Sequence, residues 1–191
     1  ALSFFTIYAN LDDWQPGKTD KLPLKERTDL DRWILLRLDQ VVGNDEEDLD
    51  SVTGWLSNYA IAPAARKLQL FVDDLTDWYI RRSRSRFWSA TETNARDKEA
   101  AYQTLYEVLT TLARLLAPFT PFMADSMHEI LVRSQRTDAS ASVHLETWPK
   151  QMDTWTDTEL RETLRLVQSI SFGQRVVGLA RAARATHDLK T

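Results

Sequence analysis

The segment from Trp78 to Trp88, WYIRRSRSRFW, places four arginines within six residues and surrounds them with aromatic side chains. An arginine guanidinium presents a rigid fork of N–H donors that fits phosphate oxygens, and a neighbouring aromatic ring can hold a base or a ribose. The chain as a whole carries a net charge of −4, so this positive cluster is a local feature. The segment therefore has the composition of a phosphate-binding or RNA-binding surface.

Two other interpretations of the arginine cluster stay open. The cluster can be an ordinary helix end, in which the arginines complement the helix dipole and pair with the acidic residues one or two turns earlier, Asp73, Asp74 and Asp77. It can also be a disordered serine–arginine segment or a nuclear localisation signal, although the flanking aromatic residues favour an ordered helix. The residues alone do not separate the first of these from phosphate binding.

A helical wheel divides the four arginines into two pairs. Arg82 and Arg86 continue the apolar stripe of the preceding helix, where a buried charge is costly unless it has a partner. We therefore expect these two arginines to be structural and to pair with carboxylates, for which the candidates are Asp31, Asp125 and Glu129. Arg81, Arg84 and Trp88 fall on the opposite, solvent-facing side, where ion pairs with Asp74 or Asp77 are weak and phosphates can reach them.

A second basic element lies near the end of the sequence, in a segment with strong helical character. Positive residues outnumber negative ones there, and they are Arg161, Arg165, Arg175, Arg181, Arg184 and Lys190. A solvated helix face is the simplest interpretation of this pattern.

Several classes of chemistry have no signature in the sequence. The chain has no cysteine, which excludes disulfides, thiol catalysis and cysteine–zinc sites. Its three histidines, His128, His144 and His187, lie far apart, and the acidic run NDEEDLD lacks the glycine and glutamate spacing of a calcium loop, so we expect no metal site. We also expect no catalytic residue, because there is no glycine-rich phosphate loop, HExxH pair or GxSxG elbow.

The sequence begins with no basic and apolar leader, and it has no apolar run near the ~20 residues that a membrane span requires. We therefore expect a cytoplasmic chain that has no contact with a membrane.

The elements that carry these residues are predicted to be all-α. Glycine and proline are few, at 5 and 6 residues, and apolar residues recur at spacings of three and four. We expect an antiparallel bundle of four to five long helices. One helix should begin near residue 28, and others should cover about 62–88, 121–133 and 157–186. A further helix should carry the stripe from Leu105 to Leu116, and the stripe from Ile61 to Tyr79 should pack against it. Gly43 and Asn44 mark either a kink or a break between two helices, and Val143 to Leu145 is a candidate extended piece.

Six segments, in this order and spacing, resemble the anticodon-binding helical domain of isoleucyl-tRNA synthetase, a class I aminoacyl-tRNA synthetase. They are FFTIYAN, DRWILLRL, WYIRRSRSRFW, AYQTLYEVL, LLAPFTPFMAD and SVHLETWP. LAPFTPF is shared with the related valine, leucine and methionine enzymes, whereas the arginine segment and SVHLETWP are narrower. The resemblance covers nearly the whole chain. It departs from the family pattern by an insertion that coincides with GNDEEDL, and we expect Gly43 to Asp50 to form an exposed turn outside the core.

The resemblance implies a parent protein that joins isoleucine to tRNA(Ile), with ATP and Mg²⁺ acting in a catalytic domain. The nucleotide-binding signatures HIGH and KMSKS of that family, its editing domain and its zinc modules are absent from these residues. Residues 1–27 would be the connection from the catalytic domain. Residues 28–191 would be the anticodon-binding bundle, truncated before a C-terminal module. No cofactor is expected in the chain itself, and a monomer is expected.

The same resemblance supports a role in tRNA binding for the basic residues near the end of the sequence. The residues expected to bind tRNA are Arg81, Arg84, Trp88, Arg175, Arg181, Arg184 and Lys190. The alternative function is that of a helical protein-interaction or scaffold domain, in which the arginines form structural salt bridges. Both functions fit the same fold, and only the first predicts a strongly salt-dependent affinity for tRNA.

Overall fold

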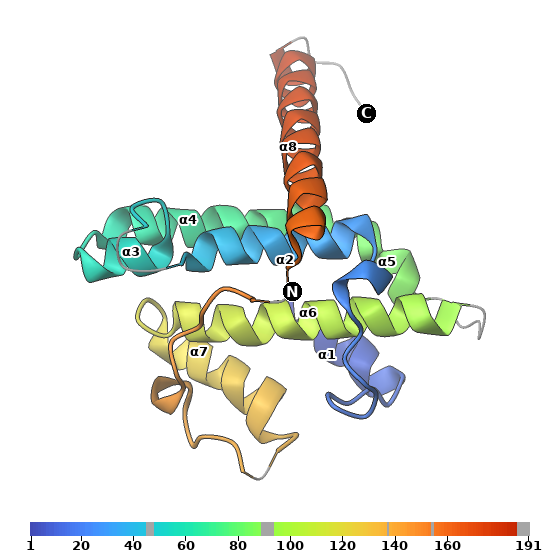
Figure 1. The fold of residues 1–191 in the computed structure, drawn as a ribbon, viewed down its shortest axis with the longest axis vertical. Helices are drawn as coiled ribbons and strands as arrows, with labels where there is room; N and C mark the ends of the chain where they lie inside the picture. Colours follow the sequence, from blue (N-terminus) through green and yellow to red (C-terminus); the bar gives the residue numbers. More distant parts are fainter. Residues whose placement is uncertain (45–47, 89–93, 137, 154, 187–191) are drawn as a thin grey trace.

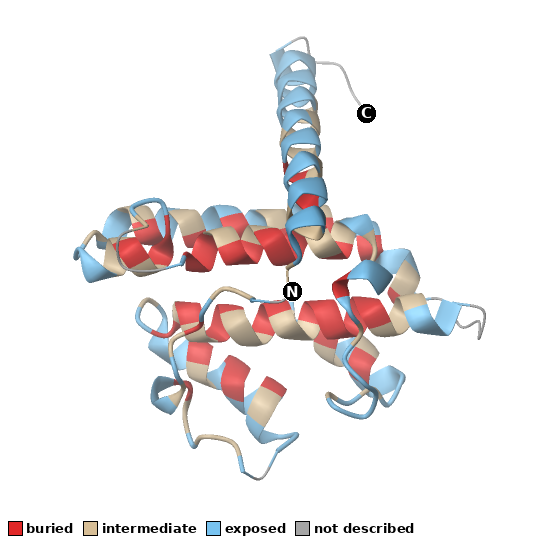
Figure 2. Cartoon of the chain, viewed as in Figure 1, coloured by how far each residue is buried: buried red, intermediate tan, exposed pale blue. Residues whose placement is uncertain are grey.

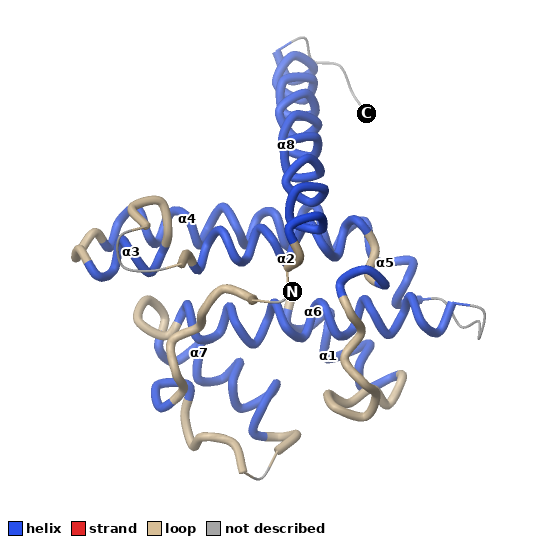
Figure 3. The backbone as a smooth tube through the Cα atoms, in the orientation of Figure 1, coloured by secondary structure: helices blue, strands red, loops and turns tan. Residues whose placement is uncertain are grey.

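The computed structural model describes residues 1–191 except 45–47, 89–93, 137, 154 and 187–191. The described residues form helices and no strand, which confirms the predicted all-α class (Figure 3). The α-helices are α1 (Leu2–Leu11), α2 (Asp29–Val42), α3 (Val52–Ser57), α4 (Ile61–Asp73), α5 (Arg81–Trp88), α6 (Ala95–Leu116), α7 (Pro121–His128) and α8 (Asp157–Thr186). Two π-helical stretches, η2 (Asp74–Ile80) and η4 (Glu129–Arg133), continue α4 and α7. The short 3-10 helices are η1 (Leu24–Glu26) and η5 (Val143–Leu145), and η5 replaces the candidate extended piece.

Local sequence accounts for where several helices begin. Thr28 caps α2 through a capping box, in which its hydroxyl accepts the N–H of Asp31 and the Asp31 carboxylate accepts the N–H of Thr28. Ser51 caps α3 by accepting the N–H of Gly54. Pro121 lies in the first turn of α7, where its missing N–H costs no hydrogen bond. These caps fix the ends of helices that the apolar pattern alone leaves approximate.

The core lies around α2 and α6, which run side by side through the body (Figure 1). α6 contacts α1, α2, α5 and α7, and red buried positions line the facing sides of these helices (Figure 2). Several of the largest buried side chains are aromatic: Trp33, Phe71, Tyr79, Phe87 and Tyr102. The rings of Phe87 and Tyr102 meet edge-on, with their centroids 4.9 Å apart, and so join α5 to α6.

The predicted packing of the stripe in 61–79 against the stripe in 105–116 is wrong. α4 packs mainly on α2 and α3, and Ile61 is 59% exposed. The positions that are buried on this helix are Ala64, Leu68, Phe71, Leu75 and Tyr79. The reason lies in α2, which buries apolar residues around most of its circumference and therefore takes the central position between its neighbours.

α8 begins and ends as predicted, but only its first part packs on the body. Thr163 and Val167 are buried where α8 meets α2, and every described residue beyond Val177 is exposed. The rest of the helix projects from the body (Figure 1, Figure 2).

The segment after α2 differs in part from the prediction. Gly43 ends α2, and a separate helix, α3, follows, so the chain breaks there rather than kinks. Leu49 and Asp50 are exposed as expected, but Gly43 is buried. Residues 45–47 of the insertion lie outside the described residues.

Candidate nucleic-acid interface

The arginine cluster lies at the end of a helix that runs through α4, η2 and α5 without interruption, from 61 to 88. Its middle part, η2, is π-helical and has more residues per turn than an α-helix, so the residues after it are rotated from their regular positions. The buried side therefore continues from Tyr79 to Ser83 and Phe87. The predicted inward direction of Arg82 is wrong for this reason, and Arg82 is exposed.

Arg86 does lie inward, and it pairs with one of the predicted carboxylates. Its Nη1 and Nη2 donate to Oδ1 and Oδ2 of Asp31, at 2.7 and 2.8 Å. Asp97 of α6 accepts from Nε and Nη2 of Arg86 at 3.0 and 2.8 Å, and the Tyr79 hydroxyl donates to Asp31 at 2.7 Å. Arg86 thus joins α2, α5 and α6 in one network of hydrogen bonds.

Electrostatics keeps this network ionised. Burial disfavours the charged form of Asp31, but the hydrogen bonds and the positive charge of Arg86, with the hydroxyls of Tyr79 and Thr28, outweigh it and lower the pKa of Asp31. Burial likewise acts against the charged form of Arg86, and Asp31 reverses the balance and raises the pKa of Arg86. The pair is a charged link inside the protein, which suits a structural role.

Asp125 and Glu129, the other two predicted partners, do not contact the arginine cluster. Asp125 accepts hydrogen bonds from the Ser142 hydroxyl and the Val143 N–H, at 2.7 and 3.0 Å. Glu129 pairs with Arg133 four residues later, at 2.5 Å. This part of the prediction is wrong because α7 and α5 pack at different ends of α6 (Figure 1).

Arg82 stacks on the indole of Trp78, one turn earlier. The guanidinium carbon lies 3.7 Å from the ring centroid, and Nη1 donates to the carbonyl oxygens of Asp77 and Trp78 at 3.2 and 3.5 Å. Partial burial and the positive charges of Arg81 and Arg181 lower the pKa of Arg82. The spacing of Trp78 and Arg82, four residues apart, is a sequence signal for this stack that the helical wheel alone did not use.

Three arginines meet in a hollow of about 390 Å³ between α8 and the junction of η2 with α5. We call it the arginine pocket, and its lining residues are Asp77, Trp78, Arg81, Arg82 and Arg181. Arg81 and Arg181 were each predicted to contact RNA, but no sequence pattern indicated that they meet. Among the described lining residues there are three arginines and one carboxylate, so the pocket suits an anion.

The position of α8 over this pocket depends on Asp74 in η2. Gln174 Nε2 of α8 donates to Asp74 Oδ1 at 2.6 Å, and Arg37 Nε of α2 donates to Asp74 Oδ2 at 3.1 Å. Asp74 was considered as a partner for Arg81 or Arg84, but these contacts occupy both of its oxygens. Asp74 therefore links α2, η2 and α8, and it sets where Arg181 emerges two turns later.

The other predicted RNA contacts lie outside the pocket. Arg84 is exposed, and it forms no ion pair within the described part of the chain. Trp88 is 58% exposed, and its indole N–H donates to the Tyr8 hydroxyl of α1. The remaining candidates are Arg175 and Arg184, which are exposed on α8, and Lys190, which lies outside the described residues.

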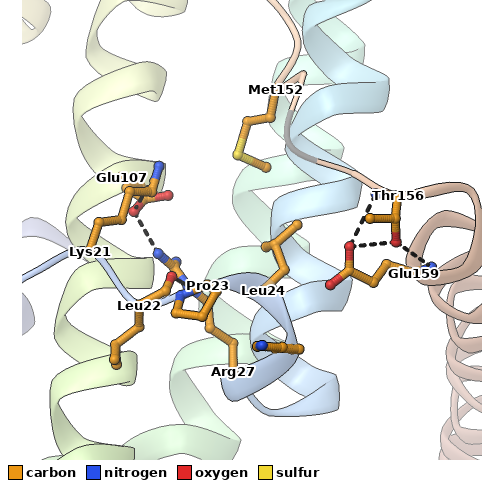
Figure 4. Close-up of a pocket in the computed structure, with 10 residues that line it drawn as sticks. Lys21, Leu22, Pro23, Leu24, Arg27, Glu107, Met152, Thr156 and Glu159 are labelled. Carbon is orange, nitrogen blue, oxygen red and sulfur yellow. Dashed lines mark hydrogen bonds and ion pairs between the residues drawn. The ribbon is translucent and has the colours of Figure 1, made fainter.

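A second hollow, of about 340 Å³, lies where the segment 21–27, α6 and the base of α8 meet (Figure 4). Its buried Arg27 is fully engaged, because the guanidinium donates to the Leu22 carbonyl, the Thr104 hydroxyl and the Glu107 carboxylate. Leu24 and Met152 make part of the wall apolar. This hollow lacks the unpaired guanidiniums of the arginine pocket and is a weaker candidate for RNA binding.

Neither a metal site nor a membrane span is found in the part of the chain that the structure describes. No group of three or more histidine, aspartate or glutamate side chains there could hold a metal ion. No helix there is both long enough and apolar enough to cross a membrane.

Known proteins match this chain along almost its whole length. Residues 31–191 match the family model described as the anticodon-binding domain of tRNA ligase. The isoleucine–tRNA ligase of Thermus thermophilus is 43% identical over 190 residues, which cover 99% of this chain and 17% of that protein. The isoleucine–tRNA ligase of Clostridium novyi is 41% identical over 188 residues, with 98% and 16% covered. That of Cytophaga hutchinsonii is 44% identical over 170 residues, with 88% and 14% covered, so the chain spans only a small part of these relatives.

Proposed function

Because the chain belongs to the anticodon-binding domain family of tRNA ligases, we propose that it is the tRNA-binding part of an isoleucine–tRNA ligase. The similarity of nearly the whole chain to isoleucine–tRNA ligases supports this proposal. In this proposal the chain binds the anticodon arm of tRNA(Ile). The complete protein joins isoleucine to that tRNA, and ATP and Mg²⁺ serve the reaction in a catalytic domain outside these residues.

The arginine pocket is the observation that carries the proposal. Arg81 and Arg82 come from α5 and Arg181 from α8, so two separate helices present guanidiniums to one hollow. A phosphate backbone supplies the negative charge that this arrangement lacks, and arginine binds phosphate oxygens with several N–H donors at once. We further propose that the chain acts as a monomer.

We extend the proposal to individual residues and segments. The tRNA contacts are Arg81, Arg84, Trp88, Arg175, Arg181, Arg184 and Lys190, and the exposed position of Arg82 supports its addition to them. Arg86 has a structural role. Residues 1–27 connect to the catalytic domain, residues 28–191 form the tRNA-binding bundle, and the protein works in the cytoplasm.

A scaffold role for the arginines has less support. It requires salt bridges within the protein, and Arg86 makes them with Asp31 and Asp97. Among the described residues, the other three arginines of the cluster form no salt bridge. Their charge is therefore available to a partner, and the family match supports tRNA as that partner.

The test is a fluorescence anisotropy titration of the chain with tRNA(Ile) and with a non-cognate tRNA, at several salt concentrations. We expect binding that weakens steeply with salt, because phosphate contacts release counterions. Replacing Arg81 and Arg84 together by alanine should flatten the salt slope by up to ~2 units and leave the melting temperature nearly unchanged.

The matched control removes two positive charges elsewhere. Arg66 of α4 and Arg165 of α8 are both exposed and lie outside the arginine pocket, so Arg66→Ala with Arg165→Ala keeps the same net charge as the test variant. A similar loss in both double variants would mean that only net charge matters. A wild-type affinity that does not change with salt would contradict the proposal.

A further inference from the structure

The arginine pocket holds more positive charge than its own residues can neutralise. Arg81, Arg82 and Arg181 line it, and Asp77 is the only carboxylate among the described residues that line it. Within the described part of the chain, none of the three arginines lies within ion-pair distance of a carboxylate oxygen, whereas Arg86 has two such partners. Like charges this close repel one another, so a bound anion would relieve the repulsion.

The donors of Arg82 are oriented before any ligand arrives. The ring of Trp78 covers one face of the guanidinium, and the carbonyl oxygens of Asp77 and Trp78 hold Nη1. Nε and Nη2 of Arg82 have no hydrogen-bond partner among the described residues. A side chain that is already fixed loses little entropy on binding, so these two donors are ready for an anion.

The third arginine comes from a helix that is only partly supported. Gln174 binds Asp74 at 2.6 Å, Val177 is the last half-buried residue of α8, and Arg181 lies one turn beyond it. An anion shared by Arg181 and the two arginines of α5 would add a bridge farther out along α8 than any contact with the body described above. Occupancy of the pocket would therefore restrict the direction in which α8 projects.

We propose that the arginine pocket binds one phosphodiester of the bound RNA strand, and that this phosphodiester links the projecting part of α8 to α5. The inference rests on the proposed function, since it takes RNA as the ligand. It goes further in two respects: it assigns a single phosphate position to three named arginines, and it makes that phosphate a link between α8 and α5. Trp78 acts as a positioning residue, because it orients Arg82.

The first experiment tests the phosphate position with an anticodon stem-loop RNA of tRNA(Ile), in which single phosphodiesters are replaced in turn by neutral methylphosphonates. We expect one position at which the replacement weakens binding to the wild-type chain about tenfold, as for one lost charge-assisted contact. In Arg82→Gln and in Arg181→Gln the same replacement should have little further effect. Arg165→Gln, an exposed arginine of α8 outside the pocket, should keep the tenfold effect.

The outcomes separate this inference from the proposed function. If the wild-type chain does not bind the unmodified stem-loop, the proposed function itself fails. If the stem-loop binds but no position depends on Arg82 and Arg181, the pocket does not hold a phosphodiester and only this inference is overturned. A position that couples equally to Arg165 would also overturn it, because the effect would then be a general one of charge.

The second experiment tests the tie between helices. Because the chain has no cysteine, Gln69→Cys on α4 and Ala180→Cys on α8 can carry two spin labels at exposed positions without other changes. Saturating stem-loop RNA should narrow the distribution of distances between the labels, and it should not do so when Arg82→Gln and Arg181→Gln are also present. If the distribution of distances between the labels is the same with and without RNA, the phosphodiester does not restrain α8.

Discussion

Asp31 is a negative charge in the interior, and its neighbours determine whether the fold tolerates it. Arg86 meets both carboxylate oxygens, the Tyr79 hydroxyl donates to Oδ1, and the N–H and hydroxyl of Thr28 donate to Oδ2. Every lone pair that points into the core thus has a donor, which is the condition under which a buried ion pair is tolerated. Loss of one partner would leave a buried charge without compensation.

Replacing Arg86 by alanine should therefore destabilise the protein strongly. We expect a loss of about 3 to 5 kcal/mol, since Asp31 would remain buried and unpaired. For a protein of this size the melting temperature should fall by about 10 °C. The matched control is Arg84→Ala, which removes the same side chain at an exposed position and should change the stability by less than about 0.5 kcal/mol. Equal effects in a thermal melt would contradict the structural role of Arg86.

The network also has a pH dependence with a definite sign. The pKa of Asp31 is lower in the folded chain than in the unfolded one, so its contribution to stability is present above the unfolded pKa and is lost as the pH falls through the folded value. This contribution therefore disappears only in acid.

Asp39 has the opposite environment. It is 4% exposed, and its carboxylate accepts hydrogen bonds from the Met152 N–H and the Trp155 indole N–H, but no cation among the described residues pairs with it. Burial raises the pKa of Asp39 to about 6, against the smaller effect of these two hydrogen bonds. The carboxylate holds the segment before α8 against α2 although it is costly to ionise there.

We predict that Asp39→Asn removes a pH dependence that the wild-type chain shows. In the wild type the folded state binds the proton more tightly, so the free energy of unfolding should fall by about 2 kcal/mol as the pH rises from 4 to 6 and then stay level. Urea unfolding at a series of pH values measures this slope. Asp73→Asn, at an exposed aspartate of α4, should keep it. A variant at position 39 that retains the full slope would contradict the assignment.

At the scale of elements, Gly43 connects α2 to α3 in a conformation that other residues avoid. Its φ is +82°, it is buried, and a Cβ atom there would overlap the side chain of Ser51. Ser51 is itself buried and caps α3. The break between the two helices is thus closely packed at Gly43 and Ser51, whereas Asn44, Leu49 and Asp50 are exposed.

Gly43→Ala should lower the melting temperature by about 4 to 8 °C, because it adds backbone strain and a clash with Ser51, together about 2 kcal/mol. Gly17→Ala is the matched control, since Gly17 also has a positive φ of +79° but has open space around it. The control reports the strain alone. If both variants lose the same stability, the Ser51 side chain can move aside, and Gly43 and Ser51 are not closely packed.

The helices themselves were predictable, whereas the faces they present were predictable only in part. The regular spacing in 105–116 and the proline at 118 located the end of α6 closely. The same spacing rule failed for Arg82, because the wheel assumes a uniform α-helix and no residue type in 74–80 indicates a π-helical turn. The wheel correctly placed Arg86 inward, and Asp31 was among its candidate partners because a buried cation needs a carboxylate. The meeting of Arg181 with Arg81 depends on tertiary packing through Asp74 and could not be read from spacing.

At the scale of the whole molecule, the body is a helical bundle and α8 is a projection from it. Apolar side chains on α8 stay exposed, among them Phe172, Val176 and Leu179. The sequence predicted a helix over 157–186, but its pattern of apolar residues did not predict that the helix would project from the body. The arginine pocket lies where the projection leaves the bundle, so the shape of the molecule and the candidate site are linked.

The molecule should have no aminoacylation chemistry of its own. We predict that the chain of 191 residues shows no isoleucine-dependent exchange of pyrophosphate with ATP, because it carries none of the nucleotide-binding signatures of the family. The comparison is with a heat-inactivated sample of the same preparation. Exchange above that background would place a catalytic centre within these residues.

The π-helical stretch has a consequence for how relatives should be aligned. A π-turn accommodates one residue more than an α-turn, so a relative that lacks one residue between 74 and 80 can form a regular α-helix and still place its counterparts of Arg82 and Phe87 on the same sides. A gap of one residue within the α-helical segment 81–88 would instead turn the residues after it by about 100° around the helix axis. In this helix, chains of unequal length can expose the same side to solvent, and an alignment without gaps can pair residues that face different ways.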